Sequence, residues 1–129
     1  MSFTERLSAD SKQKRQTGKH LPAFLLLFIA KRPAHGGALM SELGELLPDW
    51  IIDSGGVYRV LRDMEEHNLL HSTWDTPDGG APRRVYILTE DGRRELDNWR
   101  EDILARKRGL DLFVDMYDEW TKNSSEFSS

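Results

Sequence analysis

The chain has 129 residues, no cysteine, 31% charged residues and a formal net charge of −4 at pH 7. Its length fits one domain, or one small domain with a long appended element, and argues against two full domains. The lack of cysteine excludes disulfide scaffolds, cysteine nucleophiles and thiolate zinc sites, and it is compatible with a reducing compartment. At this size the core is modest, so a second copy of the chain would add stability.

The charge is unevenly distributed along the sequence. Residues 1–20 carry a net charge of +3, whereas residues 21–129 carry −7. The first segment is polar, with Phe3 and Leu7 as its large apolar residues, and we expect a flexible basic arm or a weak helix. The longest apolar run, residues 21–30, is about half as long as a membrane span. We therefore expect a cytoplasmic protein with no membrane anchor and no secretory signal.

Two helices are expected after the arm. The first begins at Leu21 with Pro22 in its first turn, and Pro33 closes it, because proline suits helix starts and ends what precedes it. It is apolar nearly all round, which predicts a buried helix. The second is short and covers 37–47, where leucines recur at helical spacing until Pro48 stops the helix.

A third helix is predicted from a cap at Asp53 or Ser54 to about His67. Its pattern is amphipathic, so one face packs inward and the other faces solvent. The inward face carries Val57, Leu61 and Met64, and the opposite face carries Gly55, Arg59, Arg62 and Glu66.

A β-hairpin is expected next. Residues 69–75 and 84–88 are both compatible with strands, and residues 76–82 between them are rich in turn-forming Pro, Asp and Gly. A further helix follows, with Thr89 as its N-cap. The order of three helices, a hairpin and a helix predicts a winged helix-turn-helix domain over 21–89 with a two-stranded wing, in a mainly α (α+β) fold.

The last helix, expected over 90–121, carries a heptad seam. Such a helix is about 48 Å long, which exceeds the breadth of a body of this size, so part of the apolar stripe requires another chain. Folding back on its own domain is the alternative. A break after Arg108, at Gly109, is also left open, and 122–129 is expected to be a disordered tail. The predicted homodimer interface consists of Leu96, Trp99, Ile103, Leu110, Phe113, Tyr117 and Trp120, with Arg106 as the polar position of the seam.

Three motifs in this order resemble the PadR family of bacterial transcriptional regulators over about residues 21–100. The sequence at 33–36 is similar to the family's Pro-x-His-Gly turn. Gly55-x-x-Tyr58-x-x-Leu61-Arg62 is similar to its recognition-helix signature. Residues 79–92 follow the wing pattern Gly-Gly-x-Pro-Arg-Arg/Lys-x-Tyr-x-Leu-Thr-x-x-Gly. Each motif alone is weakly specific, whereas the ordered set is fairly specific.

The resemblance implies a dimeric DNA-binding regulator that acts as a ligand-responsive repressor. Its third helix would enter the major groove, its wing would touch the flanking backbone and its last helix would pair two subunits. Arginine suits both phosphate oxygens and guanine edges. The residues implied to contact double-stranded DNA are Gly55, Gly56, Tyr58, Arg59, Arg62, Arg83 and Arg84.

The sequence also departs from the family pattern. Gly56 stands where a hydroxyl residue is common, and Asp53, Asp63, Glu65 and Glu66 repel phosphate. The basic arm is a candidate for compensating contacts with flanking DNA. These departures leave a second interpretation open, which is a protein-interaction or small-molecule-binding module with little DNA specificity.

Other functional sites receive less support from the sequence. Trp99 and Ile103 form a candidate pocket for a planar aromatic effector, although both fit a plain dimer core equally well. His35 is expected to be a structural hydrogen-bonding residue, and His67 and His71 need not converge on a metal. We expect no catalytic site, metal or cofactor.

Overall fold

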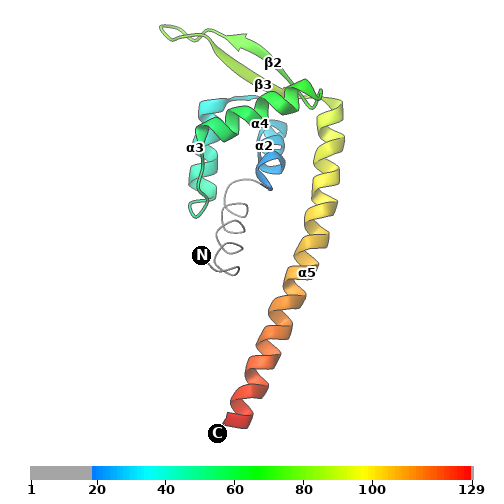
Figure 1. The fold of residues 1–129 in the computed structure, drawn as a ribbon. Coiled ribbons are helices and arrows are strands. Elements are labelled where there is room, and N and C mark those ends of the chain that lie inside the picture. Colours follow the sequence, from blue (N-terminus) through cyan, green and yellow to red (C-terminus); the bar gives the residue numbers. More distant parts are fainter. Residues whose placement is uncertain (1–18, 129) are drawn as a thin grey trace, which may run out of the picture. The chain divides into compact units, whose positions relative to one another are not determined.

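The computed structural model describes residues 19–128 (Figure 1). The chain divides into two compact units, Met1–Leu96 and Asp97–Ser129. In chain order, the elements are α2 (Leu21–Lys31), β1 (Ala34–His35), α3 (Gly36–Leu46), α4 (Ser54–Glu66), β2 (Leu70–Asp75), β3 (Arg83–Leu88) and α5 (Glu90–Ser128). This confirms the α+β fold class and the expected order of helices and hairpin. The expected arm, residues 1–20, lies almost wholly outside the described residues.

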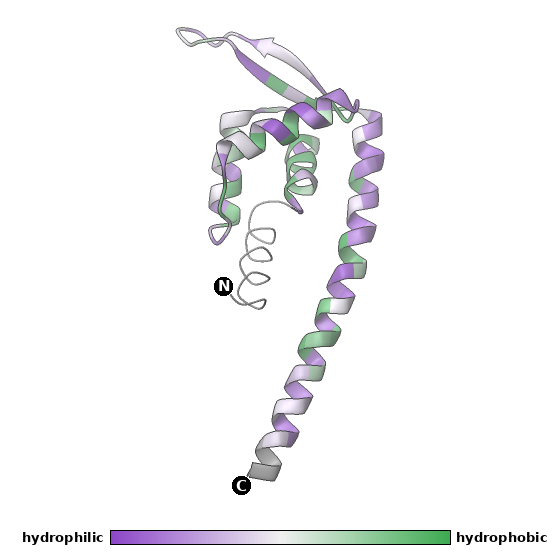
Figure 2. Cartoon of the chain, in the orientation of Figure 1, coloured by the Kyte–Doolittle hydropathy of each residue, from purple (hydrophilic) through white to green (hydrophobic). Residues whose placement is uncertain are grey.

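Helix α2 is the centre of the core in the first unit. Pro22 lies in its first turn, as expected, and the helix ends at Lys31, before Pro33. Six of its residues are buried, and Figure 2 shows the helix as mainly hydrophobic. The ring of Phe24 meets the ring of Trp50 edge-on at a centroid distance of 5.3 Å. The core therefore extends from α2 to the segment between α3 and α4.

Helices α3 and α4 both begin at side-chain caps. His35 Nδ1 accepts a hydrogen bond of 3.2 Å from the backbone N–H of Ala38, which confirms the expected structural role of this histidine. Asp53 Oδ2 accepts one of 3.1 Å from the N–H of Gly56. Because these carboxylate and imidazole groups satisfy N–H groups that a helix start leaves free, they fix where each helix begins.

The antiparallel sheet has three strands in the order β1-β3-β2. The expected hairpin forms between β2 and β3, with Ser72 opposite Tyr86. The expectation of two strands was incomplete, because β1 pairs with the other edge of β3, with Ala34 opposite Tyr86. A two-residue strand is too short to leave a periodic sequence signal.

Helix α5 is continuous through Gly109 and reaches Ser128. Thr89 Oγ1 accepts a hydrogen bond of 2.9 Å from the N–H of Gly92, which confirms the predicted N-cap. The expected end at residue 121 differs from the structure, in which 122–128 is helical. No proline follows Pro82 and no glycine follows Gly109, so the sequence contains no strong helix breaker there. No helix among residues 19–128 is long and apolar enough to cross a membrane.

Candidate nucleic-acid interface

The outer face of α4 presents two exposed arginines, Arg59 and Arg62. They lie three residues apart, so they share one face of the helix. The opposite stripe, Val57, Leu61 and Met64, is buried at 0%, 0% and 5% exposure, which confirms the predicted division of the helix. Among residues 19–128, no ion pair within 4.0 Å engages either arginine. Both guanidinium groups are therefore available to an external anion.

Tyr58 lies against Gly36, the first residue of α3. A Cβ built on Gly36 would lie 2.8 Å from both Cζ and the hydroxyl oxygen of Tyr58, so the ring occupies the space that a side chain at Gly36 would need. Tyr58 remains 44% exposed. Gly36 thus has a steric role that the sequence did not reveal, because its lack of a side chain leaves room for the tyrosine ring.

The Asp53 side chain lies beside the first residues of α4. A Cβ built on Gly55 or Gly56 would lie 3.6 or 3.5 Å from Asp53 Oδ2, an ordinary van der Waals contact. Asp53 therefore serves as the helix cap as well as being a negative charge near the candidate interface. Gly56 contributes its backbone N–H to this cap, and it has no hydroxyl of the kind that the resemblance implies.

The two wing arginines are already paired within the chain. Arg83 Nε lies 3.5 Å from Asp75 Oδ2, and Arg84 Nη1 lies 3.6 Å from Glu65 Oε1. From the sequence, both were expected beside the hairpin tip, where a flexible turn would let them follow a phosphate backbone. In the structure they lie at the first two positions of β3, opposite Asp75 and Trp74. Strand pairing brings Asp75 to face Arg83, because it fixes which residues are opposite each other.

Arg84 also lies near two aromatic residues. Its guanidinium carbon lies 5.0 Å from the centroid of the Trp74 ring, a cation–π distance. Its charge also acts on Tyr86, two positions further along β3. Burial raises the pKa of the Tyr86 phenol above its usual value, while the positive charge of Arg84 opposes that rise.

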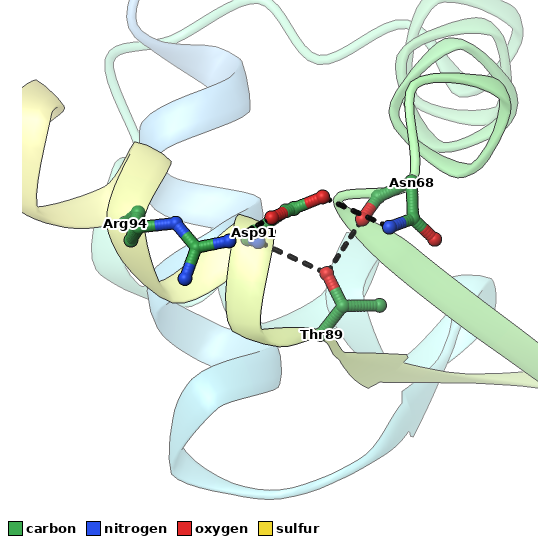
Figure 3. A network of polar contacts seen from close by, with 5 residues as sticks. Asn68, Thr89, Asp91 and Arg94 are labelled. Carbon is green, nitrogen blue, oxygen red and sulfur yellow. Dashed lines mark hydrogen bonds and ion pairs between the residues drawn. The ribbon is translucent and has the colours of Figure 1, made fainter.

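A polar network joins the end of α4 to the start of α5 (Figure 3). Asn68, at a positive φ of 63°, donates from Nδ2 to Asp91 Oδ2 at 2.9 Å. Thr89 Oγ1 donates to the backbone oxygen of Asn68 at 2.6 Å. The hydrogen bond from Asn68, together with Arg94, which pairs with Asp91, lowers the pKa of the Asp91 carboxyl. Side chains that follow α4 and side chains at the start of α5 therefore hold this junction together.

Figure 2 shows hydrophobic residues alternating with hydrophilic ones along the middle of α5. Of the predicted seam, Leu96, Trp99 and Ile103 are half-buried, whereas Leu110, Phe113, Tyr117 and Trp120 are exposed. Ring contacts link Phe113 to Tyr117 and Tyr117 to Trp120, with centroid distances of 6.4 and 5.7 Å. Arg106, the polar seam position, pairs with Asp102 at 2.8 Å. Three further exposed apolar residues of α5 were not foreseen from the sequence: Leu112, Val114 and Met116.

His67 and His71, which are four residues apart in the sequence, do not lie on the same element. His67 Nδ1 lies 2.7 Å from the backbone oxygen of Asp63, at the end of α4, while His71 is on β2. Within the described part of the chain, no three His, Cys, Asp or Glu residues are grouped in a way that could hold a metal ion.

Three contacts in this interface were not foreseen from the sequence. They are the packing of the Tyr58 ring against Gly36, the Glu65–Arg84 ion pair and the Trp74–Arg84 cation–π contact. The last two follow from the hairpin register, which depends on the length of the loop between the strands. The alternation of Leu70, Ser72 and Trp74 on one face of β2 was the available signal.

A capped helix with an exposed arginine face, preceded by a second short helix and followed by a hairpin, defines a winged helix-turn-helix protein. Comparison with known proteins agrees. The model of the Transcriptional regulator PadR-like family matches residues 25–98. The chain therefore belongs to the PadR-like family, whose members are DNA-binding transcriptional regulators.

Individual relatives are similar to the chain in sequence and in structure. Rv1176c of Mycobacterium tuberculosis, named a probable transcriptional regulator, is 27% identical over 89 residues, which make up 68% of this chain and 47% of the relative. The chain thus spans about half the length of that relative. The solved structure of TM0937, described as a potential transcriptional factor, has a TM-score of 0.71 and 30% identity, covering 81% of this chain and 93% of that chain.

A third relative supports the fold alone. The crystal structure of a PadR family transcriptional regulator from Eggerthella lenta has a TM-score of 0.67 at 23% identity, with 86% of this chain and 91% of that chain covered. The similarity therefore extends beyond the winged domain, since the covered share exceeds residues 25–98.

Proposed function

We propose that the chain is a sequence-specific repressor that binds double-stranded DNA as a homodimer in the cytoplasm. The observation that carries this proposal is the pair Arg59 and Arg62, exposed on one face of α4 and free of ion pairs with the other described residues. Helix α4 enters the major groove, where arginine can donate to guanine O6 and N7, and the wing lies along the flanking backbone.

The proposed DNA contacts fall into two classes. Arg59 and Arg62 read base edges or the adjacent phosphates, while the wing arginines contact the backbone and give affinity without sequence information. Asp53 and Glu65 reduce the positive field, so the interface relies on directed contacts more than on net charge. The full proposed set is Gly55, Gly56, Tyr58, Arg59, Arg62, Arg83 and Arg84.

The apolar face of α5 supports the homodimer. Leu110, Phe113 and Trp120 are 68%, 67% and 63% exposed. Burying one such side chain stabilises by about 1.5 to 3 kcal/mol, so several together can offset the cost of association. The heptad spacing matches a second copy of the same helix. The proposed interface is Leu96, Trp99, Ile103, Leu110, Phe113, Tyr117 and Trp120.

We also propose that a planar aromatic effector binds beside Trp99 and Ile103 and releases the DNA. Both residues are half-buried, so they offer partly screened apolar surface, and indole stacks on flat rings. Expression of a reporter under a preferred DNA site checks this part of the proposal. The protein should lower expression, and an aromatic compound that binds at these residues should restore it.

The DNA-binding experiment starts from a pool of duplexes with a randomised centre, from which the full chain selects a preferred sequence. Arg59→Ala should weaken binding to that sequence by about 1 to 3 kcal/mol, with the loss concentrated at one base step. Arg83→Ala should weaken binding to every sequence alike and lower the salt slope by about 1. Affinities are measured by fluorescence anisotropy at several salt concentrations.

The two variants serve as controls for each other, because each removes one guanidinium from a different element. If no sequence is selected and binding does not respond to salt, the protein-interaction module becomes the better interpretation. If Arg59→Ala and Arg83→Ala both leave specificity and salt slope unchanged, the proposed interface is wrong.

A further inference from the structure

One side of the hairpin carries a group of residues joined to Arg84, which we define as the wing cluster: Glu65, Ser72, Trp74, Arg84 and Tyr86. The register of the hairpin places Trp74 opposite Arg84 and Ser72 opposite Tyr86, so these four strand residues share one face of the sheet. Glu65 belongs to α4. The cluster therefore joins the wing to the recognition helix.

Within the cluster, Arg84 is held on several sides. Its Nη1 lies 3.6 Å from Glu65 Oε1, and its guanidinium carbon lies 5.0 Å from the centroid of Trp74. The side chain is still 45% exposed. A guanidinium has five N–H donors, so donors remain for an external phosphate.

Glu65 connects three elements. Its Oε2 accepts a hydrogen bond of 2.5 Å from Ser72 Oγ on β2, while its Oε1 faces Arg84 on β3. The helix that carries it also carries Arg59 and Arg62. The position of the Arg84 guanidinium is consequently tied to the position of α4.

We propose that Glu65 is a specificity-determining positioning residue, which holds Arg84 so that the wing meets a phosphate in only one placement of the recognition helix. This inference rests on the proposed DNA-binding function. An unrestrained arginine can contact a phosphate in any register, so it raises the affinity for correct and incorrect sequences equally. An arginine held in place raises the affinity only in the register in which α4 also reaches its bases. The carboxylate therefore lowers affinity for other sequences and raises the preference for one sequence.

The other wing pair provides a matched control. Asp75 and Arg83 face each other across the hairpin, 3.5 Å apart, and both belong to the hairpin itself. Asp75→Asn and Glu65→Gln each remove one negative charge beside a wing arginine. They differ in that only Glu65 lies on α4. A pure charge effect predicts the same outcome for both variants.

The experiment measures the affinity of the full chain for two duplexes, the sequence selected from the randomised pool and a scrambled version of it. We define the preference as the ratio of the two affinities. Glu65→Gln should tighten binding to the scrambled duplex about two- to threefold, because a repelling charge is lost. It should also lower the preference about tenfold, because the held geometry is lost. Asp75→Asn should tighten both duplexes alike and keep the preference.

A double variant tests whether Glu65 acts through Arg84. In the Arg84→Ala background, Glu65→Gln should no longer change the preference, because the positioned group is absent. Trp74→Leu should lower the preference in the same direction, since it removes the aromatic face beside Arg84. Circular dichroism of each variant reports whether the winged domain is folded.

The outcomes separate the two proposals. If the parent protein does not prefer the selected duplex, the proposed function fails, and this inference fails with it. If the parent prefers it but Glu65→Gln keeps the preference, or lowers both affinities together, Glu65 is not a positioning residue while the proposed function stands. The same conclusion follows if Glu65→Gln still lowers the preference in the Arg84→Ala background.

Discussion

Single residues decide how the elements of the winged domain approach one another, and Gly92 is the tightest case. It is buried in the first turn of α5. A Cβ built on it would overlap the backbone oxygen of Leu69 and lie 2.7 Å from Leu88 Cδ1. The backbone of Leu69 cannot rotate away as a side chain would. Glycine is therefore required at this position for the first turn of α5 to pack against the backbone of Leu69, next to the hydrogen bond between Asn68 and Thr89.

Gly92→Ala should lower the free energy of unfolding by about 3 kcal/mol, the upper part of the range for overpacked sites. Gly44→Ala is the matched control, because nothing lies within 4 Å of a Cβ there. The free energy of unfolding of that variant should instead rise by about 0.5 to 1 kcal/mol, because alanine reduces the entropy of the unfolded chain. Chemical denaturation monitored by circular dichroism compares them. Equal stability of Gly92→Ala and the parent would contradict the proposed close packing.

Sequence reasoning at the residue scale identified caps well and long-range neighbours poorly. Asp53 and Thr89 were predicted as caps because a cap depends on residues three positions apart in the chain. The Glu65–Arg84 pair joins positions that meet only after the hairpin has formed. Glu65 was accordingly interpreted as a phosphate-repelling charge, and its contacts with Ser72 and Arg84 were not foreseen.

At the scale of elements, helix α5 raises the question of how a glycine is tolerated in its interior. The basic run before Gly109 resembles a helix end, yet the helix continues. The heptad seam keeps its phase across the glycine, and the helix follows that phase. Periodicity over many residues therefore outweighed a local stop signal. The short strand β1 was missed because two residues are too few to show any periodicity.

Gly109→Ala should raise the stability of α5 by about 1 kcal/mol, because alanine is the better helix former and nothing lies within 4 Å of the added Cβ. The reverse change, Ala105→Gly, lies one turn earlier at another exposed position and should lower stability by a similar amount. Thermal unfolding followed at a helix-sensitive wavelength measures both. A loss of stability in Gly109→Ala would indicate that another chain approaches the backbone closely at this glycine.

At the scale of the whole molecule, the apolar face of α5 is wider than a two-residue seam. Besides Phe113 and Tyr117, the exposed apolar residues include Val114 and Met116, which flank the seam at heptad positions e and g. A wide face buries more area than a narrow one, and this favours a stable association with a second copy. The heptad count alone identified the seam residues and missed the flanking ones, because it scores only positions a and d.

Phe113→Asp should convert the proposed homodimer into monomers, because dimerisation would then bury a charge without a partner. The measured mass in sedimentation velocity at micromolar concentration should fall from about twice the chain mass to the chain mass of 14.9 kDa. Ala105→Asp adds the same charge to the same helix at an exposed position outside the seam, and it should leave the dimer intact. Since a dimer reads two half-sites at once, only Phe113→Asp should also weaken binding to the selected duplex. A Phe113→Asp protein that stays dimeric, or an Ala105→Asp protein that dissociates equally, would place the interface on another face of the helix.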